Sequence, residues 1–208
     1  FPDFIGQAIT VLPAVETVAV VINAQTGIEA MTQRMLERAA ERRQCRMIVV
    51  NKIDAENLDL PALLDQIQES FGKECLPINL PANGGASVVD CFFATTGDSD
   101  FSSVASAHSA LIDQVVEMDE DLMALYLEQG EDLQPEQLHA PFEKALREGH
   151  LIPICFVSAR TGVGIKELLD VFVKLLPNPL EGNTEPLLKG VGETDGELRV
   201  VSDSKQHA

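Results

Sequence analysis

Three continuous apolar runs limit the folds available to this chain of 208 residues. They span residues 16–24, 46–50 and 151–157, and all three are rich in branched aliphatic side chains. A strand with one face in water alternates apolar and polar residues, whereas a strand covered on both faces is apolar throughout. The sequence therefore predicts three buried strands in a sheet that has helices on both faces.

Helical periodicity accompanies the three runs. Residues 28–43, 60–71 and 165–176 place apolar side chains at intervals of three and four, and residues 3–12 do the same before Pro13. Strand and helix alternate, and no tight hairpin joins the three strands. This pattern predicts an α/β fold with a parallel sheet, flanking helices and right-handed crossovers.

One long segment interrupts this alternation. It begins with a stretch rich in proline, asparagine and glycine, and continues into a short apolar run, a polar loop and two helical patterns. We expect an α+β insert with a strand at residues 88–93 and helices at 104–129 and 135–148. The predicted organisation is a first part of the main domain at residues 1–76, the insert at 77–150, the last part at 151–179, and a linker at 180–208 with a short strand at 198–201.

The composition is that of a folded protein, since 45% of the residues are hydrophobic. No apolar run reaches the roughly 18 residues that cross a bilayer, and the first residues do not resemble a signal peptide, so we expect no membrane partner. The chain does not begin with methionine, and we interpret it as a piece of a longer protein. The cysteines lack close pairs and predict buried reduced thiols, and the histidines lack zinc-ligand spacing. The cysteines are Cys45, Cys75, Cys91 and Cys155, and the histidines are His108, His139, His150 and His207.

Acidic side chains concentrate in one part of the chain. The net charge is −18, and residues 113–150 hold eleven acidic residues against Lys144 and Arg147. The acids either form a solvated helical face or dock a basic protein, and Leu122, Leu125 and Tyr126 would add apolar contact in the second case. In both cases the surface repels phosphate backbones, so we expect no direct DNA binding.

Asn51, Lys52, Ile53 and Asp54 directly follow the second buried run. Open parallel sheets bind ligands at the carboxyl ends of their strands. Guanine presents its N1–H and its exocyclic amine side by side, and the Asp54 carboxylate can accept from both, whereas adenine has no such donor pair. The stem of Lys52 can lie along the base, and the Asn51 amide can bond to the base and to neighbouring loops.

A chance match is the alternative, because Asp54 could simply cap the helix that follows. However, the third buried run ends in Ser158 and Ala159. In the GTPase superfamily, a serine–alanine pair after a buried strand is the second guanine element. That resemblance implies that the Ala159 N–H donates to the base oxygen and that the Ser158 hydroxyl steadies Asp54.

Over about residues 1–185 the chain resembles the elongation factor G family of translational GTPases. The segments that carry the resemblance are residues 3–4, 51–54, 88–90, 158–159 and 175–179. The long separation of Asp54 from Ser158 is similar to the insert that marks this family. The resemblance implies the C-terminal half of a P-loop GTPase-type parallel sheet with an α+β insert, followed by the approach to a β-barrel domain.

The resemblance also implies a function for the whole protein. It would be a cytoplasmic, ribosome-dependent GTPase of protein synthesis that acts in translocation or recycling. GTP or GDP and Mg²⁺ would be its cofactors, with the metal bridging the β- and γ-phosphates. Its partners would be the ribosome and, through the acidic insert, a basic stalk protein of the large ribosomal subunit.

Two features depart from the family. The chain contains no G-x-x-x-x-G-K-[ST] loop, no switch threonine and no D-x-x-G element, so we expect no metal site and no tightly bound nucleotide in this fragment. Phe1 stands where the family usually has a histidine that orients the attacking water, and we assign no catalytic residue. GTP hydrolysis by the intact protein stays open, and we expect the fragment alone to be inactive. Two other hypotheses are an acidic interaction module with a decayed nucleotide site and an unrelated α/β protein with a chance motif.

Overall fold

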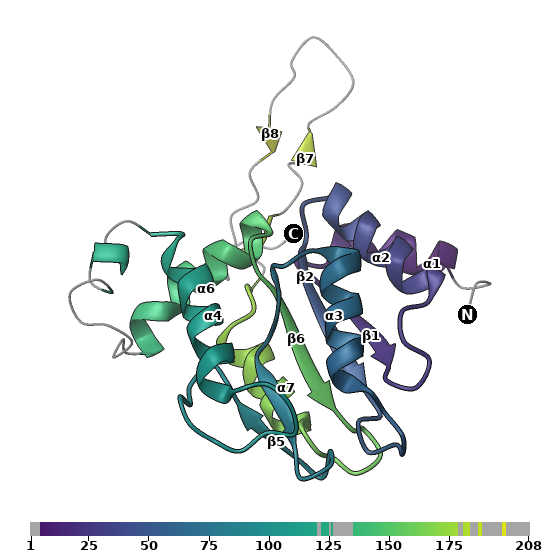
Figure 1. The fold of residues 1–208 in the computed structure, drawn as a ribbon. Helices are drawn as coiled ribbons and strands as arrows, with labels where there is room; N and C mark the ends of the chain where they lie inside the picture. The colour runs from purple at the N-terminus through teal and green to yellow at the C-terminus, as the bar shows by residue number, and fades with distance from the viewer. Residues whose placement is uncertain are drawn as a thin grey trace.

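A computed structural model gives the arrangement of the chain. It describes residues 5–119, 122–124, 126, 135–178, 181–183, 187–188 and 197–198. The central sheet consists of β1 (Thr17–Asn23), β2 (Cys45–Asn51), β6 (Ile152–Val157) and β3 (Cys75–Pro77), in that spatial order. Each neighbouring pair in this sheet is parallel, which confirms the predicted fold class. Figure 1 shows the helices packed around this sheet.

The register of the strands creates a common edge. Asn23 of β1 is aligned with Asn51 of β2, and Asn51 is aligned with Val157 of β6. The carboxyl ends of the three strands therefore lie side by side, and the loops that follow them leave the sheet together. Ligands of open parallel sheets bind at such an edge.

Strand β2 shows why the apolar runs are continuous. The helices of the two faces are α2 (Ala30–Glu41), α3 (Leu60–Phe71), α4 (Val104–Val116), α6 (Pro135–Glu148) and α7 (Ile165–Lys174). Met47 and Val49 belong to the apolar cluster under α4, α6 and α7. Ile48 and Val50 belong to the cluster under α2 and α3. Because successive side chains of a strand point to opposite faces, a strand between two helical layers needs an apolar residue at every position.

The helix boundaries have local causes. The Asp59 carboxylate accepts a hydrogen bond from the Ala62 N–H at 3.0 Å and caps α3, as short polar side chains do at helix starts. The first predicted helix is present as α1 (Ile5–Val11) and continues into a 3₁₀ turn, Leu12–Ala14, that contains the predicted stop. Helix α2 is shorter at both ends than the periodicity suggested.

The insert starts with a hairpin that the sequence only partly indicated. β4 (Asn79–Ala82) pairs antiparallel with β5 (Ser87–Asp90). The strand predicted at 88–93 is therefore present only in its first half, as β5, and residues 91–93 lie outside it. β3 and β4 were not predicted, because Pro77 ends the first and Pro81 lies within the second. Asn79 fixes the hairpin to the main sheet: its side chain accepts from the Phe156 N–H at 2.7 Å and donates to the Phe156 carbonyl at 3.1 Å.

The first helix of the insert is shorter than predicted. α4 ends at Val116, and the prediction of one helix over residues 104–129 is wrong. The Asp119 carboxylate accepts from the Leu122 N–H at 3.0 Å, which caps a separate helical turn. Leu122 is 6% exposed and packs in the core. It is therefore not available for contact with a partner, although the sequence analysis had proposed it as an apolar contact. Leu125 lies outside the described residues.

Further predictions concern the thiols and the C-terminal strand. All four cysteines are free and buried, which confirms the prediction of reduced structural thiols. β7 (Leu187–Leu188) and β8 (Glu197–Leu198) form a short antiparallel pair, so the predicted strand begins at its expected place, and residues 199–201 lie outside the described part. Within the described residues, no helix has the length and apolar character needed to cross a membrane.

Candidate functional site

Two loops that are far apart in the sequence meet at the carboxyl edge of the sheet. One follows β2 and contains residues 51–54, and the other follows β6 and contains residues 158–160. Their strands are adjacent and parallel. The Ile53 N–H donates to the Val157 carbonyl at 3.2 Å, which extends the pairing beyond the last residue of β2.

The Asn51 side chain joins the two loops. Its Oδ1 accepts from the Lys52 N–H at 2.8 Å and from the Ala159 N–H at 3.0 Å. Its backbone carbonyl accepts from the Ala24 N–H at 2.9 Å, so the loop after β1 is attached as well. One asparagine therefore connects three strand ends. The resemblance assigned the Ala159 N–H to a base oxygen, and in this structure Asn51 accepts from it.

The Asp54 carboxylate is held from the opposite loop. The Ser158 hydroxyl donates to Asp54 Oδ1 at 2.5 Å and accepts from the Thr161 N–H at 3.2 Å. Ser158 is fully buried, so the position of its hydroxyl is fixed by packing. The hydrogen bond from Ser158 is the main cause that lowers the pKa of Asp54; burial opposes it, and Arg160 assists it. At neutral pH, Asp54 is therefore an ionised acceptor.

Arg160 also binds Asp54, and the sequence analysis did not identify it. Its guanidinium lies 2.5 Å from Asp54 Oδ2. The Arg160 side chain is 79% exposed and that of Asp54 is 13% exposed, so an exposed cation pairs with a largely buried anion. A signal for this contact was present, because Arg160 directly follows Ser158 and Ala159 and must leave the same sheet edge.

Lys52 adopts a backbone conformation that is rare outside glycine, with φ of 70°. The left-handed region costs most L-residues roughly 1–2 kcal/mol, so the surrounding hydrogen bonds must compensate. The Asn51 side chain accepts from the N–H of this residue, which provides one such bond. The turn leaves the Lys52 side chain exposed at the edge where Asp54 also lies.

A loop of the insert packs against the backbone of the loop that contains Asp54. Gly85 has φ of 77°, and a Cβ at this position would overlap the Ile53 carbonyl oxygen. The Asp100 carboxylate accepts from the Gly84 N–H at 2.9 Å and from the Gly85 N–H at 3.0 Å, which fixes the loop in place. The insert is thus in direct contact with the backbone between Lys52 and Asp54.

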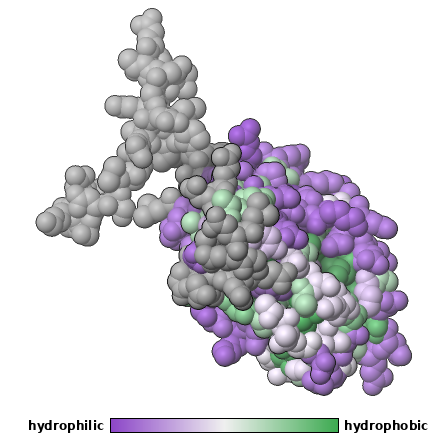
Figure 2. Space-filling model, turned by 60° about the vertical axis from the view of Figure 1, so that its left-hand side comes forward, coloured by the Kyte–Doolittle hydropathy of each residue, from purple (hydrophilic) through white to green (hydrophobic). Residues whose placement is uncertain are grey.

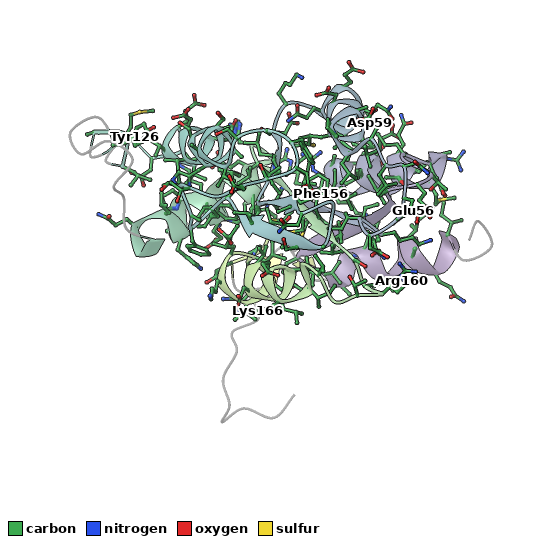
Figure 3. The ribbon with its side chains drawn as sticks, turned by 60° about the horizontal axis from the view of Figure 1, so that its bottom comes forward. Glu56, Asp59, Tyr126, Phe156, Arg160 and Lys166 are labelled. Carbon is green, nitrogen blue, oxygen red and sulfur yellow. The ribbon has the colours of Figure 1, made fainter. Side chains whose placement is uncertain are left out.

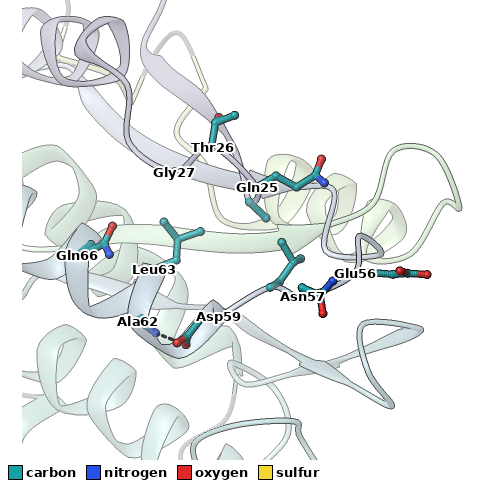
Figure 4. A pocket seen from close by; sticks show the side chains of 11 residues that line it. Gln25, Thr26, Gly27, Glu56, Asn57, Asp59, Ala62, Leu63 and Gln66 are labelled. Carbon is teal, nitrogen blue, oxygen red and sulfur yellow. Dashed lines mark hydrogen bonds between the residues drawn. The ribbon is translucent and has the colours of Figure 1, made fainter.

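Two cavities adjoin the meeting point of the loops. One has a volume of about 510 Å³ and is lined by Gln25, Lys52, Asp54, Ala55, Glu56 and Arg160. The other, of about 530 Å³, lies between the loop after β1 and the start of α3 and shares Gln25 and Glu56 with the first (Figure 4). Of these two cavities, the first is lined by Asp54 and the second by Asp59, which caps α3. Both volumes are within the usual range for small-molecule sites.

The chemistry of the first cavity favours a planar base with two adjacent donors. An ionised carboxylate with two oxygens accepts a donor pair, and the flexible stem of Lys52 offers an apolar surface beside it. Among the described residues, no group of three histidine, cysteine, aspartate or glutamate side chains is placed to hold a metal ion. Phe1, which the sequence analysis placed at the position of a catalytic histidine, lies outside the described residues.

Comparison with known proteins gives a family match and several relatives. The sequence pattern of the elongation factor Tu GTP binding domain matches residues 2–178. An elongation factor G-like protein of Mycobacterium tuberculosis is 29% identical over 217 residues, and the alignment covers 98% of this chain and 30% of that protein. An elongation factor G-like protein of Thermotoga maritima is 28% identical over 212 residues, which covers 96% of this chain and 30% of that protein.

The fold is also similar to a solved structure. A crystal structure of a protein from Thermus thermophilus matches with a TM-score of 0.73 and 29% identity, covering 87% of this chain and 29% of that chain. The chain therefore spans about 30% of the length of the curated relatives that it matches.

Proposed function

The chain belongs to the family of elongation factor Tu GTP-binding domains, and on that premise we propose that its Asp54 cavity binds the guanine base of GTP and GDP. The observation that carries this proposal is the convergence of Asp54 and Ser158 at one sheet edge, joined by a hydrogen bond of 2.5 Å. Asp54 accepts from the N1–H and the exocyclic amine of the base. Ser158 holds the carboxylate in the orientation that this contact needs.

Discrimination between bases follows from donors and acceptors. Adenine has no adjacent donor pair for Asp54, so its binding would leave a desolvated carboxylate without partners. A good bidentate contact to a base edge discriminates by roughly 1–3 kcal/mol in DNA recognition. In this site Lys52 and Ala159 lie beside the carboxylate, where a planar base can contact the lysine stem and the backbone N–H of the alanine.

The role of the whole protein is a wider proposal. We infer that this chain forms part of a cytoplasmic translational GTPase of the elongation factor G type, which acts on the ribosome in translocation or recycling. GTP and Mg²⁺ are its cofactors in that proposal. Residues of this chain recognise the base, while the phosphates and the metal require a glycine-rich loop of a kind that is not in these 208 residues.

A titration with nucleosides tests base recognition directly. Guanosine and adenosine are added separately to the ¹⁵N-labelled chain, and amide shifts are followed by NMR. We expect guanosine to shift the amides of Lys52, Asp54 and Ala159, and adenosine to leave them nearly unchanged. Equal shifts with both nucleosides would contradict guanine recognition and would leave the acidic interaction module as the better hypothesis.

The acidic insert is the proposed contact for a basic stalk protein of the ribosome. Glu117 is exposed at the end of α4, and Tyr126 of the insert lies at the end of the molecule opposite to Arg160 (Figure 3). A partner at that end would leave the base cavity free. The side of the molecule that comes forward in Figure 2 is not uniformly hydrophilic, since purple residues border a paler and partly green area.

Charge-matched variants test this contact. Glu117→Gln with Glu120→Gln removes two acids from the insert, and Asp65→Asn with Glu69→Gln removes two exposed acids from α3. The association rate with purified ribosomes is measured at low and high salt. We expect the insert pair to slow association at low salt by up to about tenfold, and the α3 pair to have little effect. Equal rates for both variants and the wild type would leave the acids a role in solubility alone.

A further inference from the structure

The exposed guanidinium of Arg160 is paired with Asp54 Oδ2, an acceptor that a guanine base would use. Asp54 Oδ2 is 2.5 Å from the Arg160 guanidinium, and Asp54 Oδ1 accepts from the Ser158 hydroxyl at 2.5 Å. We propose that Arg160 is an internal competitor of guanine, which takes Asp54 Oδ2 in the free protein and leaves it when the base binds. This inference rests on the proposed function of Asp54 and adds a residue that sets its affinity.

The competition follows from the shape of the two groups. A guanidinium is planar and presents adjacent N–H donors to a carboxylate, and the edge of guanine presents the same arrangement. The base needs both oxygens of Asp54. Arg160 approaches Oδ2 from the side of the cavity, which it lines together with Asp54, so the guanidinium and the edge of the base compete for the same space.

A second internal contact occupies a donor beside the cavity. The Ala159 N–H, which precedes Arg160 in the same loop, donates to Asn51 Oδ1 at 3.0 Å. The Ala159 N–H beside the cavity is therefore bonded to Asn51, and Asp54 Oδ2 within the cavity is bonded to Arg160. Arg160 and Ala159 are neighbours in the chain, so the movement of one loop can release both.

Arg160 can leave at small cost. Its side chain is 79% exposed, so water can take up the released guanidinium, and the base replaces it at the Asp54 carboxylate, which is 13% exposed. Salt screens the exposed side of this pair. Glu56 lines the same cavity and provides a second carboxylate for the released guanidinium; Figure 3 shows Glu56 and Arg160 on the same side of the molecule. The arginine therefore lowers base affinity modestly, by about twofold to fivefold.

The test uses guanosine, which has no phosphate that could attract the arginine. Its affinity for the chain is measured by NMR titration for the wild type, Arg160→Gln and Lys166→Gln. Lys166 is an exposed cation at the start of α7, so its variant has the same net charge as Arg160→Gln. We expect Arg160→Gln to bind guanosine about twofold to fivefold more tightly, and Lys166→Gln to match the wild type. Added salt should strengthen binding by the wild type and leave Arg160→Gln unchanged.

Two results would overturn the inference. Weaker or equal binding by Arg160→Gln would mean that the arginine contacts the base or has no effect on it. An equal gain in Lys166→Gln would assign the effect to net charge. Asp54→Ala separates this failure from failure of the proposed function: if it abolishes guanosine binding while Arg160→Gln brings no gain, only the competition is wrong. If Asp54→Ala binds as the wild type does, both proposals fail.

Discussion

The side chain of Asn79 pairs with the backbone of Phe156 through both of its polar groups. Asn79 Oδ1 accepts from the Phe156 N–H at 2.7 Å, and Asn79 Nδ2 donates to the Phe156 carbonyl at 3.1 Å. Asn79 is fully buried. The amide thus replaces a peptide group of a neighbouring strand and attaches the insert to β6, two residues before Ser158.

Removal of this amide should destabilise the fold. Asn79→Ala leaves the N–H and the carbonyl of Phe156 buried without partners, and each such group costs about 1–3 kcal/mol. We expect the free energy of unfolding to fall by about 2–4 kcal/mol in urea titrations. Gln33→Ala, which removes an exposed amide hydrogen-bonded to Glu37 on α2, should change it by less than about 0.5 kcal/mol. Similar losses in the two variants would show that the Asn79 contact is not structural.

Alanine substitutions at Gly84 and Gly85 distinguish the cost of backbone strain from the cost of steric overlap. Gly84 and Gly85 both have positive φ, but a Cβ at Gly84 meets nothing within 4 Å, while one at Gly85 overlaps the Ile53 carbonyl oxygen. Gly84→Ala should cost about 1 kcal/mol of stability and Gly85→Ala about 2–3 kcal/mol. Gly85→Ala should also shift the amide resonances of Ile53 and Asp54 and weaken guanosine binding. If both variants bind guanosine as the wild type does, the insert does not position the Asp54 loop.

The buried thiols predict a loss of stability in alkali. Burial raises the pKa of Cys155 from 9.0 to about 12. Above pH 9 the unfolded chain releases a proton that the folded chain retains, so unfolding is favoured progressively until about pH 12. The difference in unfolding free energy between the wild type and Cys155→Ala should therefore shrink by up to about 1.4 kcal/mol per pH unit in this range and stay constant below it. A difference independent of pH would contradict the raised pKa.

Nucleotide affinity of the isolated chain should be low. Much of the affinity of such sites comes from phosphate contacts and Mg²⁺, and the glycine-rich loop that supplies them is not in this sequence. We expect calorimetry with GDP and Mg²⁺ to give a dissociation constant well above micromolar, with no hydrolysis of GTP. Submicromolar binding would show that the chain holds phosphates by other residues.

The main elements of the fold could be predicted because burial on both faces leaves a clear pattern. β1, β2 and β6 appear as apolar runs, and α3 lies where its periodicity indicates. β3 was missed because it is three residues long and ends at Pro77. β4 was missed because Asn79 and Pro81 are unusual in a buried strand, and the role of Asn79 depends on Phe156, which is distant in the sequence.

The site also contains residues that the sequence indicated and residues that it did not. The sequence placed Asn51 and Asp54 at the end of one buried run, and the family resemblance singled out Ser158 and Ala159 after another; the structure brings the four together at one sheet edge, and their binding of a base stays a prediction. The contact of Gly85 could not be identified, because it depends on the path of a loop that carries no periodic pattern. Arg160 was missed although it directly follows Ser158 and Ala159. The Gly84–Gly85 pair was a signal for close backbone approach, but the sequence did not indicate which backbone it approaches.

The most direct test of the account is a change of base preference in Asp54→Asn. An amide presents one acceptor and one donor, so it suits xanthine, which has a carbonyl where guanine has its amine. The ratio of the dissociation constants for guanosine and xanthosine is measured by NMR titration on the wild type and the variant. The account predicts preference for guanosine in the wild type and for xanthosine in Asp54→Asn. A variant that keeps the full preference for guanosine would show that Asp54 does not recognise the base.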